Sequence, residues 1–275
     1  MNLTAGNYFS HDAGIAYFSV SQVKRFMDCE ARAAAELREE WKPEPTVSLM
    51  VGSYVDAHFS GELSLFRARH PAIYTRTGSL RSEYQQAESI IGRIERDGLA
   101  MRMLDGDKQR IVTGEIGGHP FKAKLDCWLS EEQCRAVARD FPQMPDLLFA
   151  PGAIVDTKIM KDFSPLYRDG EGRLNFIEYW KYDLQLAVYQ RLVAVDESNL
   201  PPCFILAATK EKTTDIGLFH IPQNLMDAAL EVAIEQLDRI AAVKRGDAEP
   251  DRCESCDYCR ETKVLLGASW LEEWI

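Results

Sequence analysis

The first hundred residues place apolar side chains three or four positions apart, which is the spacing of amphipathic helices. Near the start, Ser19 and Gln22 have capping-box spacing, and Val23, Phe26 and Met27 begin an apolar face. Three helical segments are predicted in this part of the chain: residues 17–41, residues 47–71 with an interruption near Gly61, and residues 82–104.

Strict alternation of apolar and polar positions begins near residue 109 and is typical of strands. The pair Gly117-Gly118, between two alternating runs, predicts a β-hairpin. The elements predicted after it are a strand at 153–159, a loop at 161–176, a helix at 176–195, a hairpin at 202–221 and a helix at 224–244. This order predicts an α/β fold with a mixed central β-sheet flanked by helices. We expect one domain over residues 1–275, made of a helical part (17–104), a sheet core (109–222) and a C-terminal helix with a cysteine-rich tail (223–275).

Composition narrows the classes of function without choosing one. Of 275 residues, 46% are hydrophobic and 27% are charged, which is enough apolar material for a sizeable core. The formal net charge of −11 argues against a protein that coats nucleic acid non-specifically, although it is compatible with a locally basic groove. The N-terminus lacks the regions of a signal peptide, and no apolar run reaches the ~20 residues that span a bilayer. We therefore expect a cytoplasmic protein that does not enter the membrane.

Two opposite charges stand in the apolar strand predicted at 153–159. Asp156 and Lys158 are two residues apart, so alternation places both side chains on one face. Asp126 closes a neighbouring strand, and two carboxylates on adjacent strands can hold a hard cation such as Mg²⁺. A lysine beside them could hold or deprotonate a water, or neutralise charge on a phosphate. Taken alone, the pattern also fits a surface ion pair on an exposed edge strand.

Several residues accompany this pattern in a fixed order along the chain. That order is Glu115, Asp126, Asp156-Thr157-Lys158, and Gln185 with Tyr189 four positions later. It resembles the PD-(D/E)xK nuclease superfamily in its RecB-like branch, and within it the phage-type exonuclease domains related to RecE (exodeoxyribonuclease VIII). The resemblance spans about residues 17–260 and includes the segments FSVSQVKRFMDCEA, VGSYVDAHF and RCESCDYCR.

The resemblance implies a restriction-endonuclease-like core and a DNA exonuclease that uses Mg²⁺ or Mn²⁺ in phage recombination or repair. Its implied partners are DNA and a single-strand annealing or recombination protein. The implied roles are metal ligation by Asp126, Asp156 and the backbone carbonyl of Thr157, catalysis by Lys158, orientation of the site or contact with the DNA backbone by Gln185 and Tyr189, and an accessory acid at Glu115.

The chain departs from that branch in its second predicted helix. The branch usually has a metal-ligating histidine shortly after a glycine, whereas here Asp56 holds the matching position after Gly52 and His58 follows two residues later. Residues two apart on a helix do not face the same way, so Asp56 and His58 cannot serve equally. Asp56 can take the place of that histidine as an oxygen ligand without a change of helix register. His58 could take it only if the register shifted. The predicted site carboxylates are also far apart along the chain, which implies an insertion at residues 130–150.

Seven cysteines in a chain expected inside the cell indicate metal or redox chemistry rather than a disulfide framework. Cys253, Cys256 and Cys259 are spaced so that one tight loop can present three thiolates to one centre. Cys29 is the candidate fourth ligand, because several RecB-like nucleases pair one early cysteine with three late ones around a [4Fe–4S] cluster. Zn²⁺ is the alternative, since four thiolates also suit it. Cys29 could instead be an ordinary buried helix cysteine.

Two further functions remain open at this point. A non-catalytic scaffold, or a partner protein in DNA recombination, would keep the nuclease-like fold and a structural Fe–S or zinc clamp. The acidic composition and the missing histidine favour it, and the intact set of acidic, lysine, glutamine and tyrosine residues argues against it. A redox or zinc-binding regulator would instead use the cysteine-rich tail as its functional part.

Overall fold

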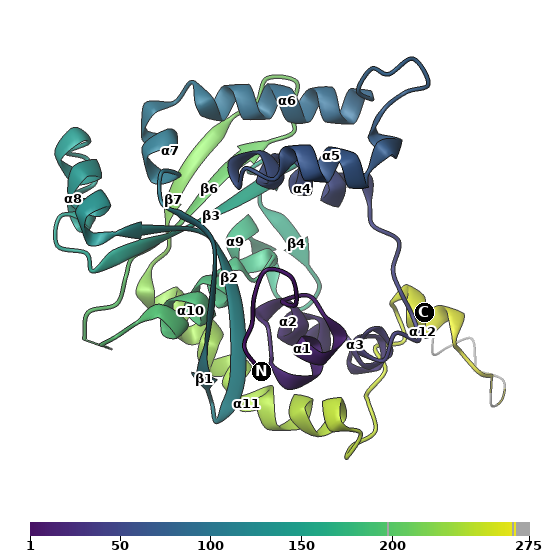
Figure 1. The fold of residues 1–275 in the computed structure, drawn as a ribbon. Coiled ribbons are helices and arrows are strands. Elements are labelled where there is room, and N and C mark those ends of the chain that lie inside the picture. The colour runs from purple at the N-terminus through teal and green to yellow at the C-terminus, as the bar shows by residue number, and fades with distance from the viewer. Residues whose placement is uncertain (197, 266, 268–275) are drawn as a thin grey trace.

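A five-stranded mixed β-sheet forms the centre of the computed structural model, which describes residues 1–196, 198–265 and 267 (Figure 1). The strands of the sheet are β1 (Asp107–Ile116), β2 (His119–Ser130), β3 (Gly152–Met160), β6 (Cys203–Thr209) and β7 (Ile216–His220), in the spatial order β1-β2-β3-β6-β7. Strands β3 and β6 run parallel, and the other neighbouring pairs are antiparallel. The predicted α/β fold with a mixed central sheet is confirmed.

Helices cover both faces of this sheet. They are α1 (His11–Ala16), α2 (Val20–Asp28), α3 (Glu30–Leu37), α4 (Val47–Phe59), α5 (Leu63–Arg69), η1 (Pro71–Ile73), α6 (Ser82–Glu95), α7 (Gly98–Met103), α8 (Glu131–Asp140), η2 (Pro145–Leu147), α9 (Phe176–Tyr179), α10 (Tyr182–Val193), α11 (Gln223–Arg245) and α12 (Asp257–Glu261). One core cluster joins α2, α3, α10 and α11 to one sheet face, and another joins α4, α6, α7 and α8 to the other face. Alternation along β3 sends Ile154 into the first cluster and Val155 into the second.

Three helices predicted as continuous are broken in the structure, each at a residue whose backbone leaves the helical region. The segment 17–41 breaks at Cys29, whose φ is −167° and whose sulfur accepts a hydrogen bond from the Arg32 amide at 3.5 Å. The segment 82–104 breaks at Asp97, which caps α7 through the Ala100 amide at 2.9 Å. The segment 176–195 breaks at Lys181, where φ is +51°. At Cys29 and Asp97, capping by the side chain replaces continuation of the helix, which periodicity of apolar residues does not register.

The hairpins are confirmed, and two connections hold more structure than predicted. The first hairpin turns at Gly117 and Gly118, whose φ values of 58° and 78° suit glycine. The region 130–150, read as an insertion, contains α8, which Ser130 and Gln133 begin with a capping box. The loop predicted at 161–176 contains a separate hairpin of β4 (Leu166–Arg168) and β5 (Gly172–Leu174).

The described part of the chain contains no helix with both the length and the apolar character needed to cross a bilayer. The tail predicted within 223–275 is described as far as residue 265 and at residue 267, so its last eight residues lie outside the described part. Within the tail, α12 returns beside the N-terminal helix α3 (Figure 1).

Candidate active site and cysteine cluster

Asp126, Asp156 and Lys158 meet where β2 and β3 diverge. Cys127 pairs with Val155, so Asp126 and Asp156 follow directly beyond the last paired residues of the two antiparallel strands. The Asp126 Oδ2 atom accepts a hydrogen bond from the Thr157 amide at 3.0 Å, which fixes this carboxylate beside β3. Lys158 Nζ forms an ion pair with Asp156 Oδ2. Asp126, Asp156 and Lys158, which the sequence predicted to form one site, therefore lie together.

The electrostatics of this group are those of crowded buried charges. Burial raises the pKa of Asp126 well above its ordinary value, and the negative charge of Asp156 raises it further. Burial alone would lower the pKa of the Lys158 amine, but the carboxylates of Asp156 and Asp126 outweigh it and raise that pKa. Lys158 is therefore a cation here, which suits it to neutralising charge on a phosphate rather than to removing a proton from water.

Gln185 and Tyr189 support the acidic pair from helix α10. The Gln185 side-chain amide donates to Asp156 Oδ1 at 2.7 Å and to the Tyr189 hydroxyl at 3.3 Å. Asp156 Oδ2 is buried and accepts no hydrogen bond from the described residues, so its interaction there is the ion pair with Lys158. A buried carboxylate oxygen whose partner is a lysine ammonium keeps a lone pair for a cation.

Helix α4 brings Asp56, and not His58, to this group. Burial raises the pKa of Asp56, and the charge of Asp156 raises it as well, which places the two carboxylates in one electrostatic environment. His58 points elsewhere, because its Nε2 lies 2.8 Å from Glu95 Oε1 on α6. Of the two candidate metal ligands on α4, Asp56 lies at the acidic group, and it is the one that needed no change of register.

Glu115 is not brought to the site. It stands opposite Pro120 beside the hairpin turn, whereas Asp126 lies near the other end of the same pair of strands. Glu115 lines a different hollow together with Arg191 and Asp227. Its geometry therefore does not support the accessory role that the resemblance implied.

A cleft of about 900 Å³ opens in front of the acidic group. Its lining residues come from α4, β3, the loop after β3 and the turn between α9 and α10, and they include Asp56, Asp126, Thr157 and Lys158. Asp56, Asp126 and Asp156 do not form a preformed metal shell. Among the described residues, the set of three or more candidate ligand atoms that all lie within 4.8 Å of one another is the cysteine cluster. Mutual repulsion of three carboxylates accounts for this wider spacing.

Two residues that the sequence did not single out contribute to the site. Lys24 on α2 and Lys158 flank the ring of Tyr182, with their Nζ atoms 5.1 and 4.9 Å from its centroid. Burial and the charge of Lys158 lower the pKa of Lys24 to about 7. Gln109 on β1 donates to Asp56 Oδ1 at 3.3 Å. Gln109 lies outside the segments that carry the resemblance, and Lys24, although it lies within FSVSQVKRFMDCEA, was given no role there; each reaches the site through packing of distant segments.

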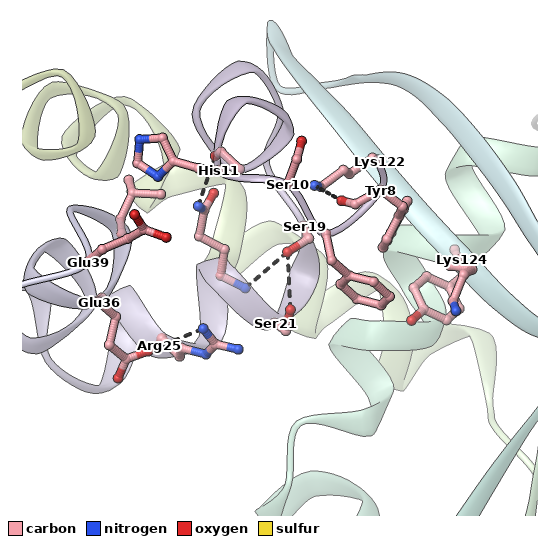
Figure 2. A pocket seen from close by; sticks show the side chains of 16 residues that line it. Tyr8, Ser10, His11, Ser19, Ser21, Arg25, Glu36, Glu39, Lys122 and Lys124 are labelled. Atoms are coloured by element: carbon pink, nitrogen blue, oxygen red, sulfur yellow. Dashed lines mark hydrogen bonds and ion pairs between the residues drawn. The ribbon is translucent and has the colours of Figure 1, made fainter. Parts of the chain in front are cut away.

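A smaller hollow of about 390 Å³ lies between the N-terminal segment, α2, α3 and β2 (Figure 2). Lys122 is only 5% exposed, and its Nζ donates to the Tyr8 carbonyl at 2.6 Å. It therefore holds the N-terminal segment against β2 and does not offer a free charge to DNA. Lys124 lies 5.0 Å from the ring centroid of Phe9, and its charge partly offsets the burial that raises the pKa of Asp56.

Comparison with known proteins identifies the family of the chain. A family model described as "PDDEXK-like domain of unknown function (DUF3799)" matches residues 19–136 and 140–262. The chain belongs to this family. It is similar to a crystal structure of a "putative exonuclease" from Eubacterium rectale, with 38% identity, a TM-score of 0.87, and coverage of 100% of this chain and 98% of that one. No curated protein matches the chain. The predicted membership of the PDDEXK nuclease superfamily is confirmed, and the RecE-related branch stays a prediction.

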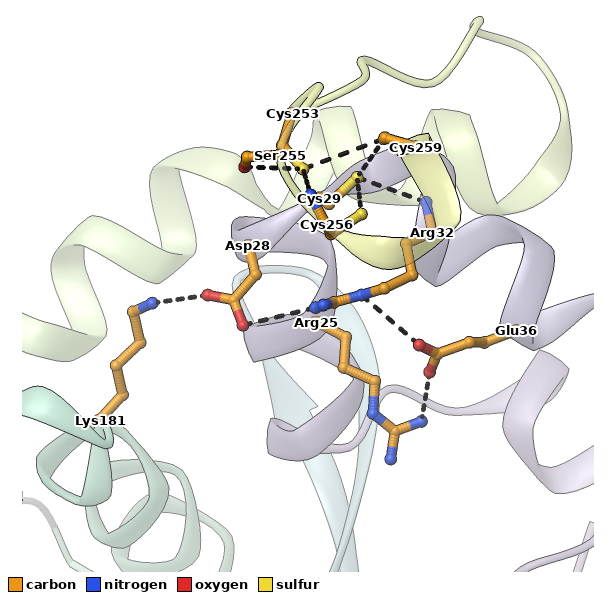
Figure 3. Close-up of polar contacts among 10 residues, drawn as sticks. All are labelled: Arg25, Asp28, Cys29, Arg32, Glu36, Lys181, Cys253, Ser255, Cys256 and Cys259. Carbon is orange, nitrogen blue, oxygen red and sulfur yellow. Dashed lines mark hydrogen bonds and ion pairs between the residues drawn. The ribbon is translucent and has the colours of Figure 1, made fainter. Parts of the chain in front are cut away.

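This PDDEXK-like chain also gathers four cysteines between α3 and its tail (Figure 3). The sulfur of Cys29 lies 3.6 Å from that of Cys259 and 3.8 Å from that of Cys256, and the sulfurs of Cys253 and Cys259 are 3.9 Å apart. All four sulfurs lie within 4.8 Å of one another. The helix break at Cys29 is what turns its thiol toward the tail, so Cys29 is not an ordinary mid-helix cysteine.

The cysteine cluster has the chemistry of a metal site. Burial raises the pKa of the Cys253 thiol, but hydrogen bonds from Ser255 and Cys256 outweigh it and lower that pKa to about 6. A thiolate is the form that binds metal, so one ligand is ionised at neutral pH. The cluster is also tied to the cleft, because Asp28, next to Cys29, forms an ion pair with Lys181 at 3.1 Å (Figure 3).

Proposed function

We propose that this chain is a metal-dependent deoxyribonuclease that removes nucleotides from DNA ends. The observation that carries the proposal is the meeting of Asp126, Asp156 and Lys158 at the floor of an open cleft, in a chain of the PDDEXK-like family. The crystal structure named as a "putative exonuclease" supports the choice of an exonuclease among the nucleases.

The donor set fits a hard divalent cation, Mg²⁺ or Mn²⁺. Asp126, Asp156 through its Oδ2 atom, and Asp56 would hold it, with the Thr157 carbonyl as a further ligand. The cation would supply Lewis-acid stabilisation of phosphate charge and would lower the pKa of water. Its binding would also relieve the repulsion that raises the pKa of Asp126 and of Asp56.

The other side chains of the site position the carboxylates and neutralise negative charge. Lys158, as a cation, would face the negative charge that develops on the scissile phosphate. Gln185 holds Asp156 in one orientation through its 2.7 Å hydrogen bond. Lys24, whose pKa is lowered to about 7, lies against the ring of Tyr182, and its positive charge would add to that of Lys158 when it is protonated.

At the cysteine cluster we propose a single Zn²⁺ ion. A tetrahedral ion with Zn–S bonds of about 2.3 Å separates its sulfurs by about 3.8 Å. Three of the six sulfur separations, 3.6, 3.8 and 3.9 Å, are close to this spacing, and all six are within 4.8 Å. A [4Fe–4S] cluster places four irons between the thiolates and would require the sulfurs to move apart. The spacing thus favours the alternative that the sequence analysis ranked second.

A role in phage recombination or repair, beside a single-strand annealing or recombination protein in the cytoplasm, rests on the sequence resemblance. We retain it as part of the proposal. It predicts a substrate that has a free DNA end, which distinguishes it from defence or restriction by cutting within a duplex.

The experiment that tests the proposed function uses wild-type protein and two substrates of equal sequence, one linear and end-labelled and one closed circular. With Mg²⁺ or Mn²⁺ we expect release of mononucleotides or short fragments from the linear DNA and no cutting of the circle, and with EDTA no hydrolysis of either. Cutting of the circle would make the protein an endonuclease. Absence of hydrolysis in every metal would leave the scaffold function in its place.

The two candidate ligands on α4 give a matched pair of substitutions. Asp56→Asn is expected to weaken the Mg²⁺ dependence, raising the metal concentration for half-maximal activity about tenfold or more, because an oxygen ligand loses its charge. His58→Ala is expected to change it less than twofold, because its ring faces Glu95. Titration of activity with Mg²⁺ measures both. A reversed order of effects would mean that α4 shifts its register when metal binds.

A further inference from the structure

One face of helix α4 forms a wall of the cleft. Leu49, Gly52, Ser53 and Asp56 all line it, and their spacing of three and four residues puts them on one side of the helix. The acidic group therefore lies at one end of this wall. Toward the N-terminus of the helix the lining consists of Thr46, Ser48 and Leu49, and Leu49 is 62% exposed.

Gly52 is unusual for the interior of a helix. A β-carbon at this position would meet nothing within 4 Å, and its φ is not positive, so neither packing nor backbone conformation requires glycine. Glycine weakens a helix interior relative to alanine, so Gly52 lowers the stability of α4, and no contact within the protein requires it. The space above Gly52 belongs to the cleft, one turn before Asp56. A glycine in such a place allows a ligand backbone to approach closely.

An exposed aromatic ring lines another part of the cleft, outside α4. Trp180, in the turn between α9 and α10, lines the cleft with 48% of its surface exposed. The turn is held firmly, because the Trp180 carbonyl accepts a hydrogen bond from Lys24 at 2.8 Å and the next residue, Lys181, pairs with Asp28. A solvent-facing indole on a backbone held in this way is a suitable platform for a nucleobase.

Lysines supply the charge that such a ligand needs. Lys158, Lys161 and Lys210 all line the cleft. Lys161 has 93% of its side chain exposed, and Lys210 contacts Ser48 near the start of α4. In a chain with a net charge of −11, this local gathering of lysines beside an aromatic ring matches the backbone and bases of a nucleic acid.

We propose that the cleft binds one strand of DNA, with a base stacked on Trp180 and the sugar–phosphate backbone passing over Gly52 toward Asp126 and Asp156. This inference rests on the proposed function and names the form of its substrate. The volume of about 900 Å³ is within the ~300–1,000 Å³ of pockets that enclose one small ligand, so it admits a few nucleotides of a single strand. A duplex end would have to separate before it enters.

The test measures binding without hydrolysis, in EDTA and again in Ca²⁺, by fluorescence anisotropy. The probes are a labelled twelve-residue thymidine strand, a strand of equal length made of abasic spacers, and a blunt duplex. Trp180→Ala is expected to weaken binding of the thymidine strand about tenfold or more and to leave the abasic strand unchanged, because only the former has bases to stack. Trp180→Phe should retain most of the affinity. Phe149→Ala, which removes an aromatic ring that is 85% exposed and does not line the cleft, is the matched control and should change nothing.

Gly52→Ala provides the second measurement. The Gly52→Ala protein should melt at a temperature equal to or higher than that of the wild type, because alanine suits a helix better than glycine and the added methyl meets no neighbour. Binding of both the thymidine and the abasic strand should fall at least tenfold, since the backbone loses its close approach. The inference is overturned if Trp180→Ala weakens both strands equally or neither, if Gly52→Ala binds normally, or if the blunt duplex binds as tightly as the single strand. Any of these results with intact hydrolysis would leave the nuclease function standing, whereas a wild-type protein without hydrolysis would remove that function itself.

Discussion

Asp126→Asn is expected to lower the rate of DNA hydrolysis by a factor of about 10³ or more. The substitution keeps the shape of the side chain and its position beside the Thr157 amide, but it removes the charge that helps to hold the cation. A loss of several kcal/mol of transition-state stabilisation corresponds to a factor of this size. Initial rates on end-labelled linear DNA at saturating Mg²⁺ measure the effect.

The same substitution is expected to stabilise the protein in EDTA. Because burial and Asp156 raise the pKa of Asp126, the folded state holds this proton more tightly than the unfolded state does. Stability is therefore lost as the pH rises through the folded pKa, and asparagine avoids this loss. The expected gain is about 1 kcal/mol at neutral pH, or about 2 °C in melting temperature, and it disappears near pH 3–4, where aspartate is also neutral in the unfolded chain.

The matched control is Glu235→Gln, which removes an exposed carboxylate on α11 that belongs to neither proposed metal site. It should alter neither the rate nor the pH dependence of stability. Wild-type hydrolysis by Asp126→Asn, in a folded protein, would show that the acidic group is not the catalytic centre.

Cys256→Ser is expected to remove the metal from the cysteine cluster and to lower the free energy of unfolding by about 4 kcal/mol or more. This corresponds to a decrease of about 8–16 °C in melting temperature. The reason is that the tail and α3 then lose the centre to which Cys29 and Cys259 both contribute. Elemental analysis and thermal melting of anaerobically purified protein measure the two effects together.

Cys134→Ala is the matched control, because Cys134 lies on the buried face of α8 and outside the cluster. It should keep one zinc per chain while losing some stability from core packing. Iron with broad visible absorbance in the wild type would overturn the choice of zinc and leave the cysteine clamp intact. Wild-type protein that carries neither metal would overturn the clamp as well.

The sequence predicted the parts of the site that depend on local periodicity. Alternation in β3 was sufficient to place Asp156 and Lys158 on one face, and the Gly117-Gly118 turn was sufficient to predict the pairing of β1 with β2, the strand that carries Asp126. It also identified Asp56 as the position that matches the register of α4, and Cys29 as the partner of the tail cysteines.

The parts that the sequence did not predict depend on contacts between distant segments. Glu115 follows the right order along the chain. Order does not reveal that Glu115 pairs with Pro120, which is six residues of extended strand away from Asp126 on β2. Lys24 and Gln109 reach Tyr182 and Asp56 only through packing of α2 and β1 against the core. Helix breaks such as Cys29 depend on one capping hydrogen bond, which the spacing of apolar residues cannot show.

The pairing of Cys29 with residues 253–259 has a consequence for the order in which the molecule matures. On the ribosome, the catalytic strands and the N-terminal helices that pack on them emerge long before the tail, so Cys29 is in place before its three partner cysteines are made. If the cluster holds the proposed metal, the tail is fixed to α3 only after the last ligands are translated and metal is supplied. A cell short of that metal would then accumulate chains whose tail is open to proteolysis.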